Sequence, residues 1–243
     1  MPTKHKKHYT HLRIRKLHLH ILLDRILFFR YIRLLHGRFW GITGLAVMCI
    51  GFFICFFIRP DLVDITTAFS VFGNDVRTAP YFVGAVFFAA YGLWRWRNYL
   101  RRTLKRPRPM LDLIALTIVG LYLVALMPLS WRPVPYFIHV AGMTLVGLSM
   151  AATVIVDGLL SKTRRTSNLR QWQFIRLLSF MCIVAGGWFT FGSLEFIAWF
   201  HVSLLGETMM LFGYTVWIFI KTYQGEGQRS FLSHMLKRFV FID

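Results

Sequence analysis

Six long apolar stretches, separated by short polar segments rich in arginine, dominate the pattern of this chain. They run at about 40–58, 80–96, 111–129, 135–160, 174–191 and 196–223. About 20 helical residues cross the hydrocarbon core of a bilayer, and each stretch meets or nearly meets that length. The pattern therefore predicts an all-α, polytopic integral membrane protein whose residues 39–223 form a bundle of six transmembrane helices.

Both ends of the chain carry a different pattern, in which basic and apolar residues alternate at helical spacing. Residues 1–38 contain ten Lys or Arg and six His, with apolar residues recurring every three or four positions. Residues 224–243 repeat this arrangement around Phe231, Leu232 and Phe239. Such segments are typical of amphipathic helices that lie in the membrane interface, so one is expected at each end.

Positive charge is distributed very unevenly across the predicted topology. With both ends inside, 26 of the 29 Lys and Arg residues lie on one side, and only Arg59, Arg77 and Arg132 lie on the other. Basic loops stay on the cytoplasmic side, which predicts cytoplasmic termini and points to the cell membrane. Anionic lipid headgroups or an acidic protein partner are expected at the basic residues of this side, foremost Arg13, Arg15, Lys16, Arg101, Arg102, Lys105, Arg106, Arg164, Arg165, Lys237 and Arg238.

Composition excludes several other classes. The chain is 56% hydrophobic and has a mean hydropathy of +0.52, which is too apolar for a soluble domain of 243 residues. The net charge of +19 lies in blocks beside apolar stretches, so nucleic acid is not expected as a partner. Cys49, Cys55 and Cys182 lie inside the stretches without metal-ligand spacing, so neither a disulfide nor a metal site is predicted. No cleavable signal peptide is expected.

Ionisable residues inside apolar stretches are costly and are functional candidates. His139 and His201 fall at nearly equal depth from the outer ends of their stretches, and Glu207 follows six residues after His201. The two histidines suit a bis-histidine haem b, a metal or a hydrogen-bonded pair, although a zinc site needs at least three protein ligands. No cofactor is the preferred expectation, with haem b between His139 and His201 as the alternative. Asp157 is expected to form an ion pair or a helix-end contact.

One string has a family resemblance. It runs Ser-Val-Phe-Gly-Asn-Asp-Val-Arg-Thr-Ala-Pro-Tyr-Phe over residues 70–82, and His139 stands at the start of the fourth stretch. These residues resemble the six-span superfamily of the damage-regulated autophagy modulators and the Sfk-like proteins, with its bacterial relatives of unknown function. The resemblance implies a small helical bundle associated with lipid organisation or stress. It also implies that Ser70, Asp75 and His139 converge on an outward-facing polar pocket.

These patterns favour a non-enzymatic membrane protein that binds a lipid or amphiphile, or that serves as an accessory subunit of a membrane complex. The candidate site is an outer pocket formed by Ser70, Asp75, His139, His201 and Glu207. Two alternatives stay open. One is an intramembrane redox or metal-dependent enzyme, and the other is a small transporter that uses Glu207 as a proton or ion carrier.

Overall fold

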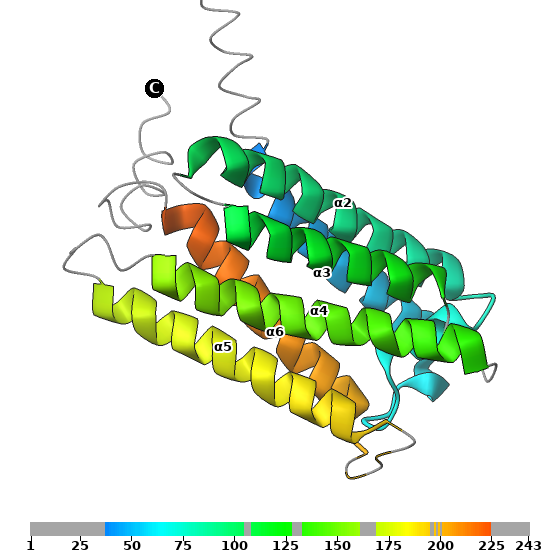
Figure 1. The fold of residues 1–243 in the computed structure, drawn as a ribbon. Helices are drawn as coiled ribbons and strands as arrows, with labels where there is room; N and C mark the ends of the chain where they lie inside the picture. Colours follow the sequence, from blue (N-terminus) through cyan, green and yellow to red (C-terminus); the bar gives the residue numbers. More distant parts are fainter. Residues whose placement is uncertain are drawn as a thin grey trace, which may run out of the picture.

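The computed structural model describes residues 37–104, 108–127, 133–160, 169–194 and 201–224, together with positions 197 and 199. This part of the chain is all-α (Figure 1). Its long helices are a first helix, Gly37–Ile58, followed by α2 (Ala79–Thr103), α3 (Arg108–Leu126), α4 (Pro133–Leu160), α5 (Leu169–Gly192) and α6 (Ser203–Gln224). Two short 3-10 helices, η1 (Pro60–Leu62) and η2 (Phe69–Gly73), lie between the first helix and α2.

Five of these six helices are long and apolar enough to cross a membrane, namely the first helix and α3 to α6. The exception is α2, whose last third carries Arg95, Arg97, Arg101 and Arg102. The apolar part of α2 is nevertheless deeply buried, because Ala89, Ala90, Leu93 and Trp96 have no exposed surface. The fold is therefore that of a helical membrane protein in which the middle of α2 is buried within the bundle.

The helices run roughly along one direction, and sequence neighbours lie side by side (Figure 1). Helix α3 packs against both α2 and α4, and α5 packs extensively against α6. Contacts between α4 and α5 are much sparser. Close packing of α5 on α6 depends on Gly186. A side chain added there would meet the carbonyl oxygen of Gly206 and come within 2.7 Å of the Met210 nitrogen. Small residues allow this close approach, and α5 follows α6 rather than α4.

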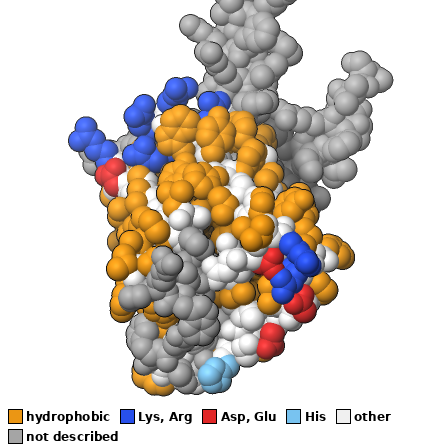
Figure 2. Space-filling model, turned by 90° about the vertical axis from the view of Figure 1, so that its right-hand side faces the viewer, with side chains coloured by type: hydrophobic (Ala, Val, Ile, Leu, Met, Phe, Trp, Pro, Cys, Tyr) orange, Lys and Arg blue, Asp and Glu red, His pale blue; other side chains and the backbone are white. Residues whose placement is uncertain are grey.

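The surface separates apolar and charged side chains. Hydrophobic side chains cover the flank of the bundle; Lys and Arg side chains gather at one end of it, and a second, smaller group lies beside acidic side chains farther down the molecule (Figure 2). We call this end the charged end; it holds Arg38, Arg101, Arg102 and Arg108, at the start of the first helix, the end of α2 and the start of α3. The opposite end, which we call the loop end, holds the connection 59–78. Large exposed apolar side chains on the flank, such as Phe57, Phe137 and Leu148, are placed to contact lipid.

A buried ion cluster joins α4, α5 and α6 near the charged end. Asp157 is 1% exposed, and its carboxylate pairs with Lys221 and lies 3.3 Å from Nε of Arg176. The indole N–H of Trp217 donates to the same carboxylate at 3.1 Å. Asp157 thus forms the expected ion pair, with partners brought in by α5 and α6 from later in the chain.

Helix boundaries lie within three residues of the predicted stretches except at the end of α2, which continues to Thr103, the start of α5, at Leu169, and the start of α6. Pro80 lies in the first turn of α2 as expected for a residue that lacks an N–H. Helix α6 begins at Ser203 rather than near residue 196. The preceding residues form a turn in which the Ser193 hydroxyl accepts a hydrogen bond from the Val202 N–H at 3.1 Å, and the Leu194 carbonyl accepts one from Ile197 N–H at 2.9 Å. These bonds satisfy backbone groups that a longer helix would have used.

The predicted interfacial segments 1–38 and 224–243 lie almost entirely outside the described residues. The same holds for most of the basic residues expected to contact lipid or a partner, which are Arg13, Arg15, Lys16, Lys105, Arg106, Arg164, Arg165, Lys237 and Arg238. Arg101 and Arg102 are described, and both are exposed at the end of α2.

Candidate ligand-binding site

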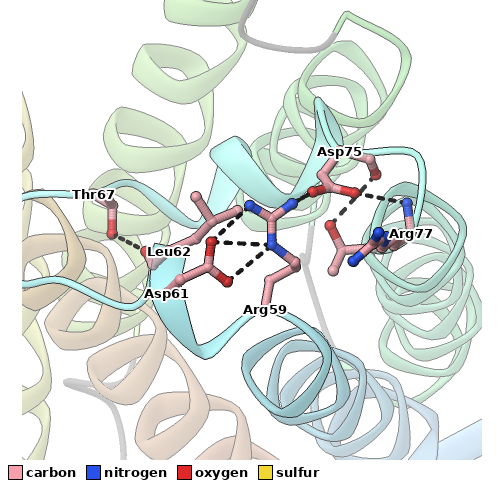
Figure 3. Close-up of polar contacts among 7 residues, drawn as sticks. Arg59, Asp61, Leu62, Thr67, Asp75 and Arg77 are labelled. Atoms are coloured by element: carbon pink, nitrogen blue, oxygen red, sulfur yellow. Dashed lines mark hydrogen bonds and ion pairs between the residues drawn. The ribbon is translucent and has the colours of Figure 1, made fainter.

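The connection 59–78 folds over the loop end of the bundle and is held by a charged cluster (Figure 3). The Arg59 guanidinium pairs with Asp75 and donates to Asp61 at 2.7–3.2 Å. This hydrogen bonding to Arg59 lowers the pKa of the Asp61 carboxyl, and the Thr66 hydroxyl lowers the pKa of Asp64 in the same way. The cluster closes the connection into a compact loop at the end of the first helix.

Aromatic stacking anchors the middle of this loop in the bundle. The Phe69 ring stacks on Phe52 with centroids 4.4 Å apart, and Phe52 stacks on Phe82 at 5.6 Å. Phe72, which is 1% exposed, packs against Phe56 at 5.3 Å. The short helix η2 therefore inserts its two phenylalanines between the first helix and α2, which sets the position of the loop backbone.

That backbone meets α6 through two long-range hydrogen bonds. The Phe69 N–H donates to Oε2 of Glu207 at 2.6 Å, and the Leu204 N–H donates to the Ile65 carbonyl at 3.2 Å. Glu207 is 4% exposed. The bond from the Phe69 N–H is the hydrogen bond that its carboxylate accepts among the described residues. The second carboxylate oxygen is thus left available as an acceptor.

His139 lies on α4 at the same end and is 2% exposed. Its Nδ1 is 2.6 Å from the carbonyl oxygen of Met127, just beyond the end of α3. Because a carbonyl can only accept, Nδ1 must carry the hydrogen, and in the neutral ring Nε2 is then an acceptor. Nε2 is buried and has no hydrogen-bond partner within the described residues. A buried polar atom in this state calls for a partner.

Both side chains line one cavity of about 250 Å³ at the loop end. Loop residues from Thr66 to Val71 form one wall, and α4, the end of α5 and the start of α6 form the others. Hydroxyl groups surround the two acceptors, and they come from Thr66, Thr67, Ser70, Tyr136, Thr144, Thr190, Ser193 and Ser203. The described lining contains no Lys or Arg. The cavity therefore favours an uncharged or cationic group that donates hydrogen bonds, and it disfavours an anion.

The structure brings together three of the five residues expected at this site. Ser70, His139 and Glu207 all line the cavity. Asp75 is turned away into the Arg59 cluster, where it also accepts the Arg77 N–H at 2.8 Å (Figure 3). His201 precedes α6, is exposed and is not among the lining residues. Because His139 is buried on α4 while His201 lies outside the cavity, we propose no haem between them.

Further lining residues escaped the sequence prediction. Tyr136, Val140 and Thr144 lie on the face of α4 that carries His139, at helical spacing. That periodicity was a usable signal for Tyr136 and Thr144. Thr190 gave no such signal. Threonines inside helices commonly donate to a carbonyl one turn earlier, as Thr190 does to Gly186 at 2.9 Å, so a threonine at such a position does not by itself indicate a site.

Comparisons with protein-family models, with curated proteins and with solved structures found no match to this chain. The resemblance of residues 70–82 to the autophagy-modulator superfamily stays a prediction. Within the described residues, no group of three or more His, Cys, Asp or Glu side chains could hold a metal ion. The chemistry of the site therefore rests on Glu207, on Nε2 of His139 and on the hydroxyl groups around them.

Proposed function

We propose that this chain is a six-span membrane protein, with α2 as the sixth span, that binds an amphiphile in the cavity at its loop end and performs no chemistry on it. The observation that carries the proposal is that two buried side chains with acceptor atoms, Glu207 and His139, line one cavity of about 250 Å³. Buried acceptors of this kind cost free energy until a donor reaches them. An amphiphile supplies the donor in its head and tolerates the apolar surroundings.

The proposed orientation puts the charged end in the cytoplasm of a cell membrane and the loop end outside. Arg38, Arg101, Arg102 and Arg108 support it, since basic side chains accumulate on the cytoplasmic side. Anionic lipid headgroups, or acidic surfaces of a membrane complex, would meet the exposed Arg101, Arg102 and Arg108, at about 1 kcal/mol for each basic side chain near the surface. In this orientation the cavity opens in the outer half of the bilayer.

Cysteine labelling tests the orientation. Val76 is 88% exposed at the loop end, and a cysteine there is expected to react with a membrane-impermeant maleimide added to intact cells. A cysteine at the exposed Arg102 is expected to react only after the membrane is opened. The unaltered chain, with Cys49, Cys55 and Cys182 in its helices, supplies the background. Labelling of Arg102→Cys, but not of Val76→Cys, in intact cells would reverse the proposed topology.

Lipid retention tests the binding site. We expect wild-type protein, purified in mild detergent, to retain a lipid that mass spectrometry detects in the extract. Glu207→Gln keeps an oxygen for the Phe69 N–H but loses the carboxylate, so retention should fall about tenfold or more. His201→Ala, at an exposed histidine outside the cavity, is the matched control and should retain the lipid fully. Equal retention by wild type and Glu207→Gln would contradict the proposed site.

A further inference from the structure

A second cavity continues the first one along the bundle. It measures about 410 Å³ and is a groove between α4 and α5, lined on α4 by Gly147, Leu148 and Ala151. On α5 its lining includes Gly187, Trp188 and Phe191. Phe191 also lines the polar cavity, so the two cavities are neighbours with this side chain as a shared wall. We call the second cavity the α4–α5 groove.

The groove and the polar cavity occupy successive turns of the same two helices. On α4 the lining passes from Val140 and Thr144 in the polar cavity to Gly147 and Ala151 in the groove, at helical spacing. From His139 to Ala151 the helix rises about 18 Å at 1.5 Å per residue. Half of a bilayer's hydrocarbon core is about 15 Å thick. The two cavities together therefore match the depth of one leaflet.

The groove is apolar and opens toward the flank. Leu148 is 66% exposed, Trp188 is 58% exposed and Trp199 is 66% exposed. The Trp188 and Trp199 rings lie 5.8 Å apart and extend the wall of the groove at the loop end. In a bilayer these side chains would contact acyl chains, so the groove offers a lateral entrance from the lipid to the polar cavity.

Two glycines keep the groove open. A side chain added at Gly147 or Gly187 would start 3.4 Å or 3.7 Å from Sδ of Met210 on α6. These are ordinary contact distances, so packing against α6 does not require either glycine. Their missing side chains instead leave the space that separates α4 from α5.

We infer that the ligand of this site is a membrane lipid with an uncharged, hydroxyl-bearing head, of the acylglycerol type, whose acyl chain lies in the α4–α5 groove. This inference rests on the proposed binding function and names its ligand class. Vicinal hydroxyls can donate to the Glu207 carboxylate and to the hydroxyl oxygens that line the cavity with it. A phosphate-bearing head would instead bring an anion beside Glu207, where the described lining offers no Lys or Arg.

Binding of radiolabelled 1-monooleoylglycerol to the purified full chain, measured by equilibrium dialysis in detergent, tests the inference. We expect saturable binding that oleoyl lysophosphatidylglycerol, with the same chain and an anionic head, displaces at least tenfold more weakly than unlabelled monooleoylglycerol. Free glycerol, which lacks the chain, should not displace the probe. Equal displacement by the anionic lipid would overturn the head-group assignment.

The groove is tested by filling it. Gly147→Leu and Gly187→Leu should each weaken monooleoylglycerol binding about tenfold or more, because each displaces several methylene groups of the chain. Gly84→Leu is the matched control, since Gly84 is exposed on α2 with no atom within 4 Å of an added Cβ. Unchanged affinity in both groove variants would overturn the groove as the chain site.

A chain-length series needs no variant and keeps the test decisive if a leucine variant fails to fold. With wild-type protein, affinity should fall steeply from an oleoyl to an octanoyl monoacylglycerol, and a flat series would overturn the inference. The proposed function is tested separately. It is contradicted if Glu207→Gln weakens the binding of no amphiphile. If the anionic lipid binds in a Glu207-dependent manner and the acylglycerol does not, the function stands and the inference falls.

Discussion

Replacing Asp157 with asparagine is expected to destabilise the bundle by about 3–5 kcal/mol, because it removes the charge that compensates two buried cations. Arg176 is 5% exposed, and the side chain of Lys221 is 11% exposed. Asparagine has nearly the same shape and can still accept the Trp217 N–H, so the effect isolates charge from packing. The loss of stability is measured by unfolding each protein with sodium dodecyl sulfate in mixed micelles and monitoring tryptophan fluorescence.

The matched control is Asp112→Asn. The Asp112 side chain is 74% exposed on α3, and its carboxylate lies 3.8 Å from Arg97, so this pair should contribute little. A second variant, Asp157→Asn combined with Lys221→Met, should recover part of the lost stability by removing one uncompensated cation. Equal stability of Asp157→Asn and Asp112→Asn would show that the cluster at Asp157 does not hold α4, α5 and α6 together.

Alanine substitutions at the adjacent glycines of α5 are expected to act in opposite directions. A Cβ at Gly186 would meet the Gly206 carbonyl oxygen and lie 2.7 Å from the Met210 nitrogen. Both are backbone atoms, so α5 and α6 must separate, at a cost of about 1–3 kcal/mol or more. A Cβ at Gly187 would lie 3.7 Å from Met210 Sδ, which is ordinary contact. Gly187→Ala should therefore be neutral or stabilising by up to ~1 kcal/mol, through helix propensity.

The same micelle unfolding assay compares the two variants with wild type. Each adds one methyl group to the same turn of the same helix, so each serves as the control for the other. Separation of α5 from α6 should also disturb Glu207, which lies next to Gly206, and lower lipid retention in Gly186→Ala. A Gly187→Ala variant as unstable as Gly186→Ala would contradict the described packing of α5 on α6.

Much of the fold was predictable from local pattern. Six apolar stretches of spanning length correspond to the six long helices, and Pro80 marks the start of α2 because it lacks an N–H. The start of α6 was missed, since Phe196 to Val202 read as a continuation of an apolar run. Apolar character indicates burial or lipid contact but does not distinguish a helix from a turn. The turn is stabilised by the Ser193 hydroxyl, whose partner Val202 lies nine residues away.

The candidate site was predictable only in part. His139 and Glu207 stood out because polar groups inside apolar stretches are costly, and Ser70 through the family resemblance; all three line the cavity. Asp75, from the same resemblance, and His201, from its apolar stretch, lie elsewhere. Asp75 has an arginine close in the fold, at Arg59, and an opposite charge is a stronger partner than a hydroxyl-lined cavity. Pairings of this kind depend on where the loop backbone runs.

Local pattern alone established the helical class, the apolar flank and the uneven charge, because hydrophobicity and charge act on each segment independently. The tertiary structure decided which groups meet. It joined Asp157 to Arg176 and Lys221, placed the Phe69 N–H on Glu207, and brought His139 and Glu207 to one cavity. It also packed α5 much more closely on α6 than on α4. These outcomes follow from side-chain volume and from hydrogen bonds between distant segments, which no single stretch of sequence encodes.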